Sequence, residues 1–217
     1  MYFGEVTSVS GASFYASEMS GILGLAYGSI SVDALPTFID ASSLTDKSFA
    51  FYLHENPTSS YMTLPGYEQS AFNGEMTFHN VVEEKYWALN LTGMAQGTNK
   101  IPVTGYKAVI DSGTSTLVGP SNLVNQITAG ITVKPDCSNI DTLPTISFFI
   151  DGIEYQLEGS DYAMKVSALG QTECLLGIMA MDFPSGFDYF ILGDIFMRKY
   201  YSYFDKNQNR VGFATAA

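Results

Sequence analysis

The feature that most constrains the fold is a series of short apolar runs, each closed by Gly, Asn or Pro, as is typical of strands. In residues 145–159, TISFFIDGIEYQLEG, two alternating runs are joined by Asp151-Gly152, a strong signal for a tight hairpin. Further strands are predicted at residues 48–54, 75–81, 85–93 and 106–111, and a closing hairpin at 201–214. The sequence therefore predicts a mainly β fold in which antiparallel pairing dominates.

Helices are predicted to be few and short. Residues 121–131 follow Pro120, with Ser121 as the expected N-cap, and residues 194–201 follow Gly193. A third short helix is expected within residues 31–39.

Composition excludes some classes of partner. The 217 residues include 10 Lys and Arg against 22 Asp and Glu, a net charge of −12, so no basic surface is expected to bind nucleic acid. No apolar run approaches the ~20 residues that span a bilayer, and the first residues lack a signal-peptide pattern. We therefore expect either a cytosolic protein or one whose true N-terminus lies upstream.

Two cysteines, Cys137 and Cys174, are too few for a metal cluster and lack the Cys-x-x-Cys spacing. One disulfide is the natural pairing and would indicate an oxidising compartment, while two buried thiols are the alternative. The histidines, His54 and His79, lie in strand-like runs with no nucleophile motif nearby, so surface or half-buried structural roles are expected.

One motif places a charge where an apolar run ends. In residues 108–120, AVIDSGTSTLVGP, Asp111 enters a turn of small residues whose hydroxyl and amide donors can hold a carboxylate ionised. An Ile-Leu-Gly core also occurs twice, in GILGLAY (21–27) and FILGDIF (190–196). The repeat suggests two related halves.

These motifs resemble the pepsin-like aspartic endopeptidases over nearly the whole chain. The resemblance is carried by residues 21–38, 74–94, 108–120, 143–157 and 190–216, which are GILGLAYGSISVDALPTF, GEMTFHNVVEEKYWALNLTGM, AVIDSGTSTLVGP, LPTISFFIDGIEYQL and FILGDIFMRKYYSYFDKNQNRVGFATA. Asp-Ser-Gly-Thr alone is a weak signal. Its specificity comes from the Ile-Leu-Gly strand 80 residues later and the closing hairpin.

The resemblance implies a pepsin-like acid protease fold with one catalytic aspartate in each lobe. Asp111 would be the aspartate of the C-terminal lobe, beside the strand residues Ile191, Leu192 and Gly193. Its support would come from three neighbours: the Ser112 hydroxyl linking the two catalytic loops, the Gly113 amide, and the Thr114 hydroxyl on the outer carboxylate oxygen. Two such aspartates would hydrolyse peptide bonds by general acid-base activation of water.

The first catalytic aspartate and the substrate-covering flap are expected outside this chain. Spacing taken from the repeat places a partner for Ile22 some 80 residues upstream of it, before Met1. Residues 1–66 would then be a remnant of the N-terminal lobe, and 67–217 a complete C-terminal lobe. Other aspartates lack the motif, and Asp194 is expected to cap the helix after it. Those others are Asp33, Asp40, Asp46, Asp182, Asp188 and Asp205.

The resemblance also places substrate contacts at Tyr86, Val109, Thr114, Ser115 and Met181, each of which also has an interpretation as ordinary packing. An apolar cleft would favour cleavage between large hydrophobic residues. The spacing of the two cysteines matches a family disulfide. No cofactor and no metal are implied.

The expected partners are a peptide or protein substrate, the N-terminal lobe or chain, and pepstatin-type inhibitors. The resemblance and the disulfide favour a secreted, lysosomal or vacuolar protein. Asn90-Leu91-Thr92 is a possible glycosylation site.

The main alternative is a catalytically inactive protein, truncated or a pseudoprotease, that acts as a binding module, because half of an aspartate pair lacks the partner that separates the two pKa values. Self-association of two Asp111 loops is a further alternative, which the remnant lobe would obstruct.

Overall fold

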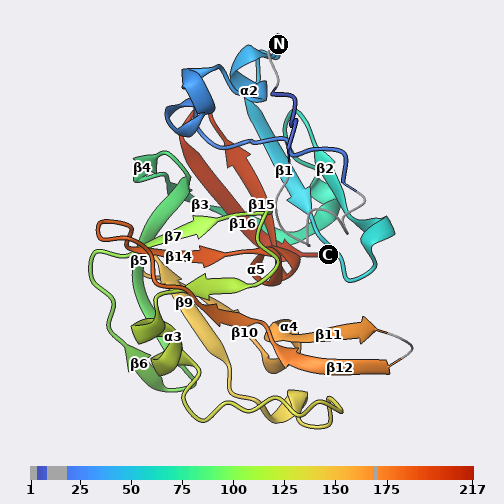
Figure 1. Cartoon of the computed structure of the whole chain (residues 1–217), viewed down its shortest axis with the longest axis vertical. Helices are drawn as coiled ribbons and strands as arrows, with labels where there is room; N and C mark the ends of the chain where they lie inside the picture. The colour runs from blue at the N-terminus through green and yellow to red at the C-terminus, as the bar shows by residue number, and fades with distance from the viewer. Residues whose placement is uncertain (1–3, 9–18, 169–170) are drawn as a thin grey trace.

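The computed structural model describes residues 4–8, 19–168 and 171–217, and these form a mainly β molecule with a few short helices. Figure 1 shows the arrangement. The strands are β1 (Ser48–Tyr52), β2 (Tyr61–Thr63), β3 (Phe72–Asn80), β4 (Glu83–Glu84), β5 (Trp87–Gln96), β6 (Asn99–Ile101), β7 (Lys107–Ile110), β8 (Leu117–Gly119), β9 (Ile146–Ile150), β10 (Ile153–Leu157), β11 (Ala163–Ala168), β12 (Gln171–Leu176), β13 (Ile178–Ala180), β14 (Tyr189–Leu192), β15 (Tyr200–Asp205) and β16 (Arg210–Ala216).

The helices are α2 (Phe38–Ala41), α3 (Ser121–Ile127), α4 (Gly159–Tyr162) and α5 (Asp194–Lys199). Short 3-10 turns lie at Gly28–Ile30, Val32–Ala34, Pro57–Ser59, Gln69–Ala71 and Ile140–Thr142. The prediction of mainly β structure with few short helices is confirmed.

A five-stranded antiparallel sheet has the order β2-β1-β15-β16-β3. It joins strands that are far apart in the sequence: Phe49 of β1 lies opposite Phe204 of β15, and β15 pairs with β16 in the predicted closing hairpin. In Figure 1 this sheet brings the cyan β1 against the red β15. Early and late segments of the chain therefore share one sheet.

The second sheet has the order β10-β9-β5-β7-β14-β8-β13, with β4 and β6 also paired to β5. The predicted hairpin is confirmed, because Ile150 of β9 pairs with Ile153 of β10 and both turn residues have positive φ, 50° at Asp151 and 80° at Gly152. Two pairs depart from the antiparallel expectation: β14 runs parallel to β7, and β13 parallel to β8. Strands β11 and β12 form a separate two-stranded sheet.

Two predicted helix caps are wrong. Pro120 occupies the N-cap position of α3, and Ser121 is its first residue. The backbone N–H and the hydroxyl of Ser121 each donate to the carboxylate of Asp182, at 2.8 Å, so the capping side chain comes from far along the chain. At α5, Gly193 is the N-cap and no side chain caps the helix, so Asp194 is its first residue and does not cap it.

The core is continuous between the early and late segments. The buried rings of Phe49 and Phe204 stack with centroids 4.9 Å apart, and Trp87 packs edge-on against both. Tyr27 and Ile39 belong to the same cluster of buried residues. Packing therefore crosses the sequence boundary expected after residue 66.

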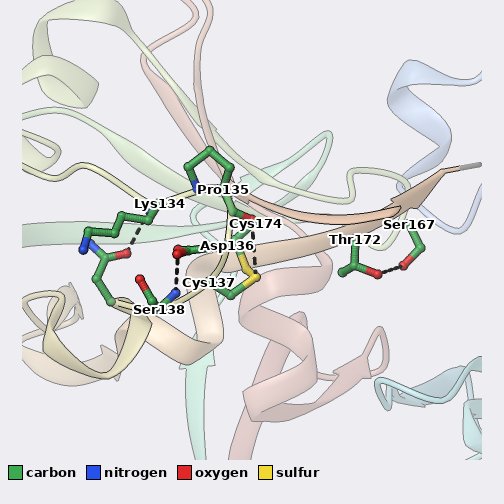
Figure 2. Close-up of a disulfide and its surroundings, with 9 residues drawn as sticks. Lys134, Pro135, Asp136, Cys137, Ser138, Ser167, Thr172 and Cys174 are labelled. Carbon is green, nitrogen blue, oxygen red and sulfur yellow. Dashed lines mark hydrogen bonds between the residues drawn. A yellow bond between two sulfur atoms is a disulfide. The ribbon is translucent and has the colours of Figure 1, made fainter. Parts of the chain in front are cut away.

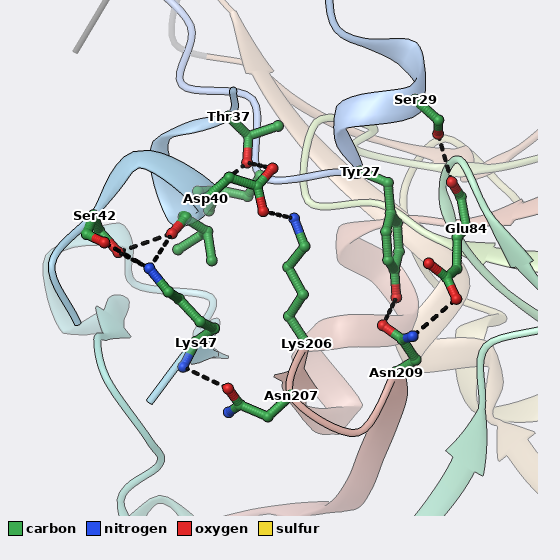
Figure 3. A network of polar contacts seen from close by, with 12 residues as sticks. Tyr27, Ser29, Thr37, Asp40, Ser42, Lys47, Glu84, Lys206, Asn207 and Asn209 are labelled. Atoms are coloured by element: carbon green, nitrogen blue, oxygen red, sulfur yellow. Dashed lines mark hydrogen bonds and ion pairs between the residues drawn. The ribbon is translucent and has the colours of Figure 1, made fainter. Parts of the chain in front are cut away.

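A polar network at the turn of the closing hairpin strengthens this connection (Figure 3). The Tyr27 hydroxyl donates to the side-chain oxygen of Asn209 at 3.2 Å, and the Asn209 amide donates to Glu84 at 2.8 Å. Lys206 forms an ion pair with Asp40. Segments near residues 27–40 are thus attached to the last hairpin of the chain.

The cysteines form the predicted disulfide, Cys137–Cys174 (Figure 2), and the described residues include no free cysteine. The bond connects an exposed turn to the buried Cys174 of β12, whose N–H donates to the Pro135 carbonyl at 2.9 Å. The alternative of two thiols is therefore wrong.

The histidines have different surroundings. His54 is exposed, whereas His79 is 1% exposed, more deeply buried than the half-buried position expected. Ile22 and Leu23 of GILGLAY are 79% and 51% exposed. Over the described ranges, the structure has no helix long and apolar enough to cross a membrane.

Candidate active site

Asp111 follows β7 directly, at the centre of the larger sheet. Residues Ala108 to Ile110 are buried, and β7 pairs in parallel with β14, where Ile110 lies opposite Leu192. The Asp111 N–H donates to the Leu192 carbonyl at 3.2 Å. The strand pairing therefore fixes the Asp111 backbone while its side chain stays half-exposed.

Two hydrogen bonds hold the Asp111 carboxylate. The Thr114 hydroxyl donates to Oδ2 at 2.6 Å, and the Gly113 N–H donates to Oδ1 at 3.0 Å. These two donors hold both oxygens of the Asp111 side chain in place.

Gly193 lets the Asp111 loop cross the end of β14. A Cβ at this position would lie 1.9 Å from the Thr114 carbonyl oxygen and 2.5 Å from that of Thr116. The Asp194 N–H donates to the same Thr114 oxygen at 2.8 Å. No residue larger than glycine fits here without moving the backbone, and the crossing brings Asp111 beside the Ile-Leu-Gly strand.

Ser112 and Ser115 belong to the same loop as Asp111. Both residues are exposed. Within the described part of the chain, no side-chain hydrogen bond is made by the Ser112 hydroxyl.

An apolar aromatic face adjoins Asp111. Val109, Ala88 and Tyr189 form a buried cluster against which Tyr86 and Ile191 pack. Side chains two residues apart along an extended chain point to the same face, so Val109 lies on the same face as Asp111. Met181 lies outside this cluster, directly after β13, and is 52% exposed.

A family profile described as eukaryotic aspartyl protease matches residues 1–216. The chain belongs to this family. Cathepsin D of Chionodraco hamatus is 38% identical over 99% of the chain and 58% of its own length, that of Bos taurus 37% over 99% and 60%, and that of Homo sapiens 38% over 99% and 56%. The aspartyl protease chain therefore spans less than two thirds of these relatives.

Sequence reasoning missed a charged network beside the aromatic face of this aspartyl protease chain. Glu83 accepts hydrogen bonds from Lys107 at 2.7 Å, from the Tyr189 hydroxyl at 2.8 Å and from Lys85 at 2.8 Å. These donors, Lys107 first, lower the pKa of Glu83 to about 2. Lys107 of β7 and Tyr189 of β14 lie opposite each other. The network could have been found only from the register of these two strands, which the sequence alone does not give.

Sequence reasoning also did not predict that Asp194 interacts electrostatically with Asp111. Burial raises the pKa of Asp194 to about 6, while Arg198 opposes this rise and the charge of Asp111 adds to it. Its position directly after Ile-Leu-Gly was visible in the sequence, but its partial burial was not.

Among the described residues, no group of three or more His, Cys, Asp or Glu side chains could hold a metal ion.

Proposed function

We propose that the polypeptide containing this chain is an aspartic endopeptidase in which Asp111 is the second of two catalytic aspartates. The observation that carries the proposal is the Asp111 carboxylate, half-exposed and held by Thr114 and Gly113 where its loop crosses the Ile-Leu-Gly strand. In such a site two adjacent carboxylates share one proton, an effect for which the aspartic proteases are themselves the standard example.

The proposed reaction needs no metal and no nucleophilic side chain. The ionised aspartate accepts a proton from water as the water oxygen attacks the peptide carbonyl carbon. The protonated aspartate donates to the carbonyl oxygen, and the tetrahedral intermediate then expels the amine as it gains a proton. Thr114 and Gly113 would keep the Asp111 oxygens in position through this cycle.

The second aspartate and the flap would come from an N-terminal lobe, on the same polypeptide or on an associated chain. The greater length of the cathepsin D relatives supports this, as does the exposure of Ile22, Leu23 and Ser112. In this proposal residues 1–66 end the N-terminal lobe and 67–217 form the C-terminal lobe. The shared five-stranded sheet would be the connection between them.

The proposed substrates are peptides or proteins with large hydrophobic residues at the cleaved bond. Tyr86 and Val109 contribute to the apolar face beside Asp111, while the exposed Ser115 and Met181 would contact substrate nearer the rim. Pepstatin-type inhibitors would bind the two-lobed enzyme. The disulfide and the net charge of −12 favour a secreted, lysosomal or vacuolar location and activity in acid.

One observation favours the alternative of an inactive binding module: among the described residues, Asp111 alone combines the motif with both supporting hydrogen bonds. Cleavage of a denatured protein at acid pH distinguishes the two functions. We expect pepstatin-sensitive cleavage that Asp111→Asn abolishes and Asp188→Asn preserves, because Asp188 is exposed and outside the loop. Equal activity of both variants, or no cleavage by the full polypeptide, would contradict the proposed function.

A further inference from the structure

The sequence Asn90-Leu91-Thr92 lies on β5 with the geometry of a surface acceptor. Asn90 and Thr92 are exposed on one face of the strand, and Leu91 between them is 2% exposed on the other. We propose that Asn90 carries an N-linked glycan. The other Asn-x-Thr triplet, Asn56-Pro57-Thr58, has the proline that prevents transfer.

The Cys137–Cys174 disulfide supports this assignment independently. A disulfide between an exposed turn and a buried strand residue indicates folding in an oxidising compartment. In eukaryotes that compartment also contains the enzyme that transfers oligosaccharide to Asn-x-Ser/Thr. The chain that acquires this bond would therefore encounter the glycosylation machinery while Asn90 is still accessible.

The transfer balances with a lipid diphosphate-linked oligosaccharide as donor. A bond forms between Nδ2 of Asn90 and C1 of the first sugar, the C1–O bond to the lipid diphosphate breaks, and Nδ2 loses one proton. One N–H remains on that nitrogen. In the folded structure the Thr92 hydroxyl accepts from the Gly152 N–H and donates to the Phe149 carbonyl, both at 3.0 Å, so transfer precedes the closure of this hairpin.

The remaining N–H has a defined acceptor. Nδ2 of Asn90 lies 3.2 Å from Oδ1 of Asp151, whose Oδ2 is 3.0 Å from Nδ1 of the buried His79. The His79 ring continues to the Tyr155 hydroxyl at 2.6 Å. A glycosylated Asn90 therefore keeps its contact with a cluster that joins β3 to the β9–β10 hairpin.

A shallow hollow of about 400 Å³ adjoins Thr92 and gives the first sugars a surface to lie on. Phe149, Ile101, Pro102 and Gly93 make it largely apolar, and Lys100 also lines it. The C–H faces of a sugar ring can cover such a surface and remove it from water. We therefore expect the glycan to protect the β9–β10 hairpin.

The test produces the full polypeptide through a eukaryotic secretory pathway and measures mass before and after treatment with a peptide-N-glycosidase. We expect a loss of one glycan from the peptide containing Asn90, no glycan in Asn90→Gln or Thr92→Ala, and a retained glycan in Thr92→Ser. Pro57→Ala, which removes the block at Asn56, shows that the host can modify this chain. An unmodified Asn90 in secreted protein, with Asn56 modified in that variant, would overturn the proposal.

A second measurement tests the retained contact with Asp151. Peptide-N-glycosidase converts Asn90 to aspartate and so places a second carboxylate beside Asp151, whereas an endoglycosidase that leaves one sugar keeps the amide N–H. At neutral pH we expect a lower Tm for the first product than for the second. Slower hydrogen exchange in residues 146–157 of the glycosylated form is expected as well. Equal Tm values for the two products would contradict the contact between Asn90 and Asp151. Equal hydrogen exchange with and without the glycan would contradict the proposal that the glycan covers the hollow. Neither readout requires protease activity, so failure of the proposed function leaves this test unaffected.

Discussion

At the scale of single residues, the structure explains why Asp111 is placed at the end of an apolar strand. Its carboxylate is satisfied within three residues, by the Gly113 amide and the Thr114 hydroxyl. The family resemblance implied these two partners, and both lie in the same turn as Asp111. The sequence did not reveal Tyr189 and Glu83, because their hydrogen bond joins residues 106 apart.

Thr114→Val should lower kcat/KM of the active polypeptide without unfolding it, because the variant retains the shape of threonine but loses the 2.6 Å bond to Oδ2 of Asp111. A hydrogen bond to a charged group is worth about 1.5–3 kcal/mol, which corresponds to roughly a 10- to 100-fold loss. Thr114→Ser keeps the hydroxyl and should retain most activity. Equal kcat/KM values for the two variants would refute the role of this hydroxyl.

Asp194 should make the folded state less stable as the pH rises through the weakly acidic range. Burial raises its pKa from 3.8 to about 6, so the folded state binds more protons than the unfolded state between these values. Stability therefore falls from about pH 4 to pH 6, and Asp194→Asn should reduce this fall. Thermal unfolding of both proteins at the two pH values measures the effect. Asp188→Asn is the control and should show the same fall in stability as the parent protein. An equally large fall in Asp194→Asn would contradict the role of Asp194.

At the scale of elements, the sequence predicted what is local and missed what is not. The β9–β10 hairpin follows from alternation and Asp151-Gly152, which adopt the positive φ values that such a turn needs. The parallel pairing of β7 with β14 joins segments some 80 residues apart, and no local signal specifies its direction. The cap of α3 was misassigned to Ser121 for the same reason, since the capping carboxylate belongs to Asp182.

Gly193→Ala should be severely destabilising, because its Cβ would lie 1.9 Å from the Thr114 carbonyl oxygen. The backbone must move, and a loss of stability of about 4 kcal/mol or more is expected from strain of this kind. Denaturant unfolding of the 217-residue chain measures the loss. Gly24→Ala is the matched control, because Gly24 follows Ile22-Leu23 and has no atom within 4 Å of the added Cβ. Similar stabilities of the two variants would contradict the steric explanation.

At the scale of the whole molecule, early and late segments of the described chain share one sheet and one core. β1 and β2 pair in the same sheet as β3, β15 and β16, and Phe49 packs on Phe204. The short apolar runs predicted the mainly β class. These runs did not predict that the early segment would lie against the last hairpin, because that contact depends on pairing between distant strands.

The proposed N-terminal lobe gives Gly24 a different role in a longer polypeptide. If a second catalytic loop crosses Ile22-Leu23-Gly24 as the Asp111 loop crosses Ile191-Leu192-Gly193, then Gly24→Ala should destabilise the longer protein by an amount similar to Gly193→Ala. In the 217-residue chain the same change should have little effect. Unfolding curves of both lengths report the difference. Tolerance of Gly24→Ala in both would contradict the predicted crossing.

Pairing of Asp111 with a second catalytic aspartate is tested most directly by retention of the natural protein on immobilised pepstatin at acid pH. The eluted material is then identified by peptide mass analysis. We predict that peptides containing Asp111 are recovered together with peptides from an N-terminal lobe that carries a second Asp-Thr/Ser-Gly motif, and that Asp111→Asn prevents retention. Recovery of Asp111 peptides with no second motif, or unchanged retention of the variant, would contradict the assignment of Asp111 as half of a catalytic pair.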